Sequence, residues 1–169
     1  MIDVYWTESL ATIQDRALTQ GADMSLWVAA FLAGGFGIVA LQSFLTILRF
    51  VTSSSISVPT LLGGAVMPRL KRKNRNSVGA FLHLVTGALL CVIFIGILDT
   101  ALSRLPLGWS SVAFSSVLWL GYGLLLLPLM GVSVMGQKEH PLFWVHLLFG
   151  FLLYSIVIAL VFPFLYLQS

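Results

Sequence analysis

The chain has 169 residues, of which 59% are hydrophobic and only 9% are Asp, Glu, Lys or Arg. Soluble domains carry about 25% charged residues, so this composition excludes an ordinary water-soluble globular protein. The formal net charge of +3 is small. The apolar residues form runs about as long as the ~20 residues of helix that cross a bilayer, which indicates a small polytopic membrane protein.

Residues 1–24 form the first predicted unit, in which four acidic residues accompany a single Arg16. Their apolar side chains recur at helical spacing, and these are Ile2, Trp6, Leu10, Ile13 and Ala17. We therefore expect an amphipathic helix at the membrane surface, followed by a transmembrane domain over residues 25–169.

Four apolar segments of the second unit predict an all-α membrane fold, with transmembrane helices over residues 25–48, 78–100, 111–134 and 142–167. The segments are joined by short connections, so we expect a four-helix bundle.

The first span carries small residues at every fourth position, which allows close helix approach in lipid. One row is Ala29, Ala33 and Gly37, and a second is Ala30 and Gly34. Its polar residues Gln42 and Thr46 should face other helices, because lipid offers them no hydrogen-bond partner.

The connection at 49–77 combines a short helical segment with a basic cluster. Pro59 fits the first turn of a helix, and the segment is too short to cross a bilayer. Five basic residues follow, which are Arg69, Lys71, Arg72, Lys73 and Arg75. They predict a cytoplasmic anchor that attracts anionic lipid headgroups. A nucleic-acid interface is excluded, because the cluster adjoins a span and lacks a recognition fold.

The charge distribution also predicts the orientation of the chain. If the connections 49–77 and 135–141 are cytoplasmic, the basic cluster is inside and both termini are outside, as the positive-inside rule requires.

A short pattern occurs in both the second and the fourth span, 63 residues apart. His83 and Gly87 are four residues apart, and so are His146 and Gly150. Together with similar Gly-aromatic-Gly strings in the first and third spans, this pattern predicts two helix hairpins related by a parallel duplication.

The two histidines leave several hypotheses open. Both would lie about 7–8 Å inside the cytoplasmic edge, on helices that run in the same direction. His83 and His146 could be the axial metal ligands of one haem b, with Gly87 and Gly150 leaving room for the macrocycle. Alternatively, each histidine hydrogen-bonds a neighbouring helix where glycine allows close contact. A quinone site, a lipid site and a proton relay are further alternatives.

Three features together resemble a family of small four-helix prokaryotic integral membrane proteins of uncharacterised function. They are Pro-Thr-Leu-Leu-Gly-Gly at 59–64, the histidine–glycine pairs, and the third span with Trp119-Leu120-Gly121 and Pro128. The resemblance covers residues 25–160. It implies the four-helix fold and a location in the prokaryotic cytoplasmic membrane, and it carries no catalytic residues.

No phosphate-binding loop, HExxH motif or GxSxG elbow occurs in the sequence. We therefore favour a non-catalytic protein over an enzyme, acting as an accessory or structural subunit of a larger membrane complex, such as a respiratory or other energy-transducing one. Its partners would be the bilayer and other membrane subunits. The alternative function is a small b-type cytochrome that passes electrons to quinone.

Overall fold

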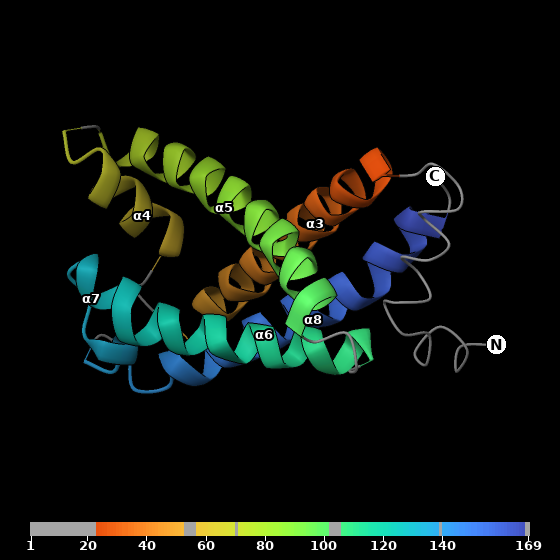
Figure 1. Cartoon of the computed structure of the whole chain (residues 1–169). Helices are drawn as coiled ribbons and strands as arrows, with labels where there is room; N and C mark the ends of the chain where they lie inside the picture. Colours follow the sequence, from red (N-terminus) through yellow and green to blue (C-terminus); the bar gives the residue numbers. More distant parts are fainter. Residues whose placement is uncertain (1–22, 53–56, 70, 102–105, 139, 168–169) are drawn as a thin grey trace.

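The computed structural model describes residues 23–52, 57–69, 71–101, 106–138 and 140–167. Every regular element in these ranges is a helix (Figure 1). The elements are α3 (Asp23–Thr52), α4 (Val58–Val66), α5 (Arg72–Ala101), α6 (Leu107–Gly121), the π-helix η1 (Tyr122–Leu126), α7 (Leu127–Leu129), the 3-10 helix η2 (Val134–Gly136) and α8 (Phe143–Leu167). The amphipathic helix expected within residues 1–24 lies almost entirely outside the described residues.

Within the described residues, four helical segments are long and apolar enough to cross a membrane. They are Leu26–Thr52, Lys73–Ile97, Leu107–Leu129 and Phe143–Tyr166. The predicted all-α fold with four membrane-crossing helices therefore agrees with the structure, and the chain has the character of a multi-pass integral membrane protein.

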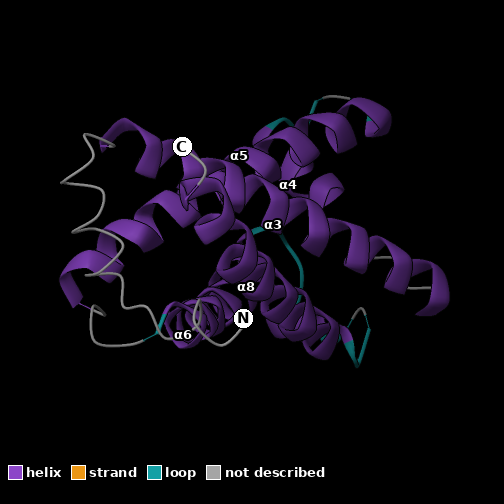
Figure 2. Cartoon of the chain, turned by 90° about the vertical axis from the view of Figure 1, so that its right-hand side faces the viewer, coloured by secondary structure: helices purple, strands orange, loops and turns teal. Residues whose placement is uncertain are grey.

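The helices pack in the order α5, α3, α8, α6. Helix α3 packs against both α5 and α8, and α8 also packs against α6, whereas α5 and α6 contact each other through the stacked rings of Phe94 and Phe114, whose centroids are 4.6 Å apart (Figures 1 and 2). Consecutive spans run in opposite directions, so the start of α3 and the end of α8 lie at one end of the molecule. The other end carries the end of α3, α4, the start of α5 and the start of α8, and we call it the basic end.

Small residues form the seam between α3 and α5. A Cβ atom added to Gly34 would lie only 2.6 Å from the Cβ atom of Cys91 and 2.8 Å from the carbonyl oxygen of Gly87. Added to Gly87, it would lie 2.7 Å from Cγ1 of Ile38. Both small-residue rows of α3 are buried, as is the face of α5 that carries Gly79, His83, Gly87 and Cys91. Gly34 and Gly87 bring the backbones of α3 and α5 close together, as small residues at this spacing predict, whereas Gly37 faces Tyr154 of α8.

Helix α4 is held against α5 by two glycines. Gly63 faces the backbone carbonyl of Arg75, and Gly79 faces that of Pro59, so closely that a Cβ atom at either glycine would overlap the carbonyl oxygen. Pro59 lies in the first turn of α4, as predicted. The short helix expected in the first connection is therefore confirmed.

The boundaries of the first two spans differ from those predicted. Helix α3 continues to Thr52, and α5 already begins at Arg72, so Arg72, Lys73 and Arg75 belong to a helix and not to a loop. An apolar run marks only the part of a helix that is in lipid. The polar extension of α5 is helical because α4 packs against it.

The third span ends at Leu129 and not at residue 134. Pro128 has no N–H group, so it cannot continue the regular hydrogen-bond pattern. The helix changes to a π-helix just before it, where the N–H of Leu127 reaches back to the carbonyl of Tyr122. At Pro128 the span therefore forms a π-helical turn and then ends.

Candidate functional site

His83 is a buried polar residue of α5 at the basic end of the molecule, and only 8% of its surface is exposed. Its Nδ1–H donates a hydrogen bond of 3.2 Å to Oε1 of Gln42 on α3, because an amide oxygen can only accept. Gln42 therefore faces another helix, as predicted. For His83, the contact agrees with the hypothesis of a hydrogen bond between helices.

His146 has a different environment, in the first turns of α8. It is half-buried, and its ring lies 5.5 Å from the ring of His140, measured between centroids. It lines a pocket between α8 and the end of α3. His83 is not among the residues that line this pocket, although its hydrogen-bond partner Gln42 is.

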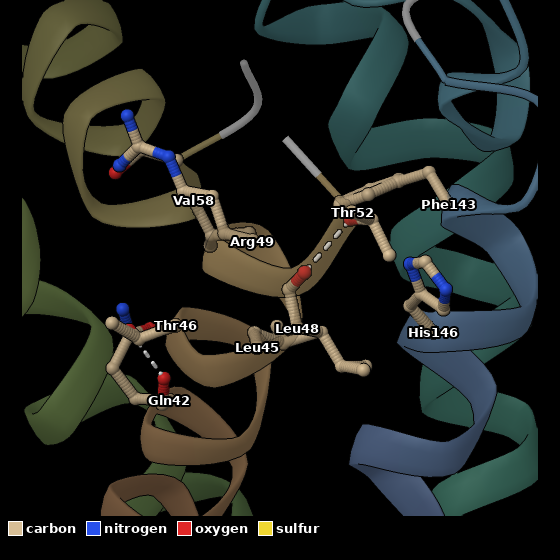
Figure 3. Close-up of a pocket in the computed structure, with 10 residues that line it drawn as sticks. Gln42, Leu45, Thr46, Leu48, Arg49, Thr52, Val58, Phe143 and His146 are labelled. Atoms are coloured by element: carbon tan, nitrogen blue, oxygen red, sulfur yellow. Dashed lines mark hydrogen bonds between the residues drawn. The ribbon is translucent and has the colours of Figure 1, made fainter. Parts of the chain in front are cut away.

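A pocket with a partly polar lining lies beside His146 at the basic end (Figure 3). Its free space is about 420 Å³ with the open mouth included, of which about 30 Å³ is deep enough to hold the centre of a water molecule. The end of α3, the start of α4 and the start of α8 line it with Gln42, Leu45, Thr46, Leu48, Arg49, Thr52, Ser57, Val58, Phe143 and His146.

The polar wall of this pocket is a stripe on α3, formed by Gln42, Thr46, Arg49 and Thr52. These four residues are three or four positions apart, so they share one face of the helix. The hydroxyl of Thr46 donates to the carbonyl of Gln42 at 2.7 Å, and that of Thr52 donates to the carbonyl of Leu48 at 2.8 Å. Both hydroxyl groups therefore present oxygen lone pairs outward.

Sequence analysis identified Gln42 and Thr46 but placed Arg49 in the connection. The spacing of Gln42, Thr46, Arg49 and Thr52 was the available signal, and it is only meaningful once α3 is known to continue to Thr52. The other walls of the pocket come from distant parts of the sequence. They are Ser57 and Val58 on one side and Phe143 on the other, and no local sequence pattern predicts that they meet.

Other side chains fill the space beside Gly87 and Gly150, the two glycines of the repeated pattern. Ile38 occupies the position next to Gly87, while Leu41 and Leu45 lie 3.4 Å and 3.7 Å from a Cβ atom built on Gly150. The packing of α3 against both α5 and α8 therefore leaves no room there for a macrocycle between the two imidazoles. The residues present do not fit a bis-histidine haem in this arrangement.

Metal chemistry has little support in the part of the chain that the structure describes, where no three His, Cys, Asp or Glu side chains gather. The rings of His140 and His146 lie close together, as described above. Nδ1 of His140 accepts a hydrogen bond of 3.3 Å from the backbone N–H of Leu142.

The predicted headgroup cluster lies at the same end as the pocket. Arg69, Lys71 and Lys73 are exposed, and the guanidinium group of Arg75 donates to the carbonyl of Pro68. The side chain of Arg72 lies outside the described residues. Five cationic residues thus surround the junction between α4 and α5, with Arg49 of α3 on the pocket side.

Comparison with models of known families, with curated proteins and with solved structures found no match to this chain. The resemblance drawn from residues 25–160 therefore stays a prediction.

Proposed function

We propose that the chain is a non-catalytic integral membrane protein that serves as an accessory or structural subunit of a larger membrane complex. The observation that carries the proposal is the exposure of the third span. Only 17% of its most apolar stretch is buried within the chain, compared with 39% for the first, 33% for the second and 44% for the fourth span.

The outer face of α6 has the features of a helix-packing surface. Ala113, Val117 and Leu120 are exposed on it, and no atom lies within 4 Å of a Cβ atom built on Gly121. Small residues on an exposed face allow a second transmembrane helix to approach closely, which is how association is driven in lipid. Helix α6 is the span that gains most from a partner.

The orientation and origin of the protein are part of the same proposal. With the basic end in the cytoplasm, both termini lie outside and residues 1–24 lie on the outer surface of a prokaryotic cytoplasmic membrane. The pairs α3–α5 and α6–α8 each pack together, which supports their origin as a parallel duplication. We do not propose an electron-carrying cytochrome, because Ile38, Leu41 and Leu45 occupy the space beside the two glycines where a haem was expected to fit.

The proposal is tested by photo-crosslinking in native membranes. A photoreactive amino acid is placed at Val117 on α6 or at Val39 on α3, two exposed valines in separate spans with exposed fractions of 66% and 54%. We expect Val117 to give a discrete adduct with another membrane protein, whose mass identifies the complex, and Val39 to give adducts with lipid only. Lipid adducts alone at both positions would refute a partner on α6.

A further inference from the structure

We propose that the pocket formed by the end of α3, the start of α4 and the start of α8 binds the phosphate of an anionic phospholipid. The inference concerns a small-molecule site and is independent of the partner surface on α6. It rests on the lining of the pocket, on the charge around it and on its size.

The lining is divided into a polar and an apolar part. Arg49 supplies a guanidinium group, and Gln42, Ser57 and His146 supply further groups that can donate hydrogen bonds. Leu45, Leu48, Val58 and Phe143 supply the apolar part. An occupant with a charged head and a hydrocarbon portion matches both parts, whereas a fully apolar or a fully hydrated ligand matches only one.

Charge at the basic end favours an anion. Residues 49–77 and 135–141 contain seven basic residues, which are Arg49, the five of the cluster at 69–75 and Lys138, and one acidic residue, Glu139. Two helices, α4 and α8, also begin at the pocket, with Ser57–Val58 and Phe143 in its lining. Helix N-termini carry partial positive charge. The opposite partial charge at the end of α3 is offset by Arg49, which lies in its last turn.

The size of the pocket limits what can enter it. Its inner part, of about 30 Å³, accommodates a small oxygen-bearing group that reaches in from the mouth. Arg49 and Thr52 are in the last turns of a span, at the depth where lipid headgroups meet the hydrocarbon. A phosphate that enters from this level leaves its acyl chains alongside Leu45 and Leu48.

The experiment uses the purified full chain in neutral detergent, with its five tryptophans as the fluorescence reporter of thermal unfolding. Phosphatidylglycerol, phosphatidylcholine and sodium phosphate are titrated separately. We expect phosphatidylglycerol to raise the Tm, and phosphatidylcholine and sodium phosphate to have much smaller effects at equal concentration. A Tm shift of equal size with sodium phosphate would overturn the lipid as the source of the anion.

Two variants assign the effect to the pocket. Arg49→Gln removes a charge from the lining of the pocket, and Lys138→Gln removes the same charge from a loop residue at the same end that does not line it; both side chains are exposed. We expect R49Q to weaken phosphatidylglycerol binding at least ten-fold, because a charge-assisted hydrogen bond is lost, and K138Q to change it less than two-fold. Equal losses in both would overturn the proposal in favour of diffuse surface attraction. If R49Q does not fold, His146→Ala removes the opposite wall, and unchanged affinity in that variant also overturns it.

Discussion

The hydroxyl of Tyr154 on α8 donates a hydrogen bond of 2.7 Å to the backbone carbonyl of Gly87 on α5. To reach it, the tyrosine ring crosses α3 at Gly37, where an added Cβ atom would lie 2.6 Å from Cδ2 of the ring. One buried side chain therefore joins three helices, and it does so through a gap that only glycine leaves open.

Tyr154→Phe should destabilise the protein by about 1 kcal/mol, the usual net value of one hydrogen bond. The matched control is Tyr122→Phe, because the buried hydroxyl of Tyr122 has no hydrogen-bond partner in the structure. We expect Y122F to be neutral or slightly stabilising. Thermal unfolding in detergent measures both variants, and equal destabilisation would contradict the assigned bond.

Gly34→Ala should destabilise the protein by about 1–3 kcal/mol, the usual cost of overpacking a close contact. The added methyl group meets the Cβ atom of Cys91 and the backbone of α5. The adjacent Gly35 has no atom within 4 Å of the same position, so Gly35→Ala should be neutral or stabilising. The two unfolding temperatures, compared under one set of conditions, check the prediction. It fails if both variants unfold at the wild-type temperature.

The contact between His83 and Gln42 should appear as a coupling free energy. Gln42→Leu and His83→Leu each leave a partly or fully buried polar group without its partner, which costs about 1–3 kcal/mol. The double variant should cost less than the sum of the two, by about 0.5–1.5 kcal/mol. Chemical unfolding of all four proteins gives this double-mutant cycle. Strict additivity would mean that the two residues do not interact.

The visible spectrum of the gently solubilised protein tests the haem hypothesis directly. We expect no Soret band, because Ile38 fills the space beside Gly87, and Leu41 and Leu45 fill that beside Gly150. A Soret band that disappears in both His83→Ala and His146→Ala would contradict the helix packing described above.

Periodicity within one helix was the part of the fold that the sequence predicted well. The rows around Ala29 and Gly34 on α3 are buried, because four-residue spacing places small residues on one face whatever the partner helix is. Pro59 likewise marked the start of α4, since proline acts on the local backbone.

Contacts between distant segments could not be predicted in this way. The repeat of His83 and His146 gave them equivalent places in the sequence, yet one hydrogen-bonds Gln42 and the other lines a pocket. Their difference arises because α3 packs between α5 and α8, and nothing in either local pattern determines which helix occupies the centre. The role of Tyr154 depends on the same packing order.

The contact of Gly63 and Gly79 with backbone carbonyls gives the first connection a mechanical property. α4 and α5 touch through main-chain atoms. The basic residues that follow α4 are therefore held in a fixed position relative to the two helices. The spatial pattern of positive charge at the membrane edge is therefore set by two uncharged residues. A single methyl group added at Gly79 would rearrange that pattern and leave every charge in the sequence unchanged.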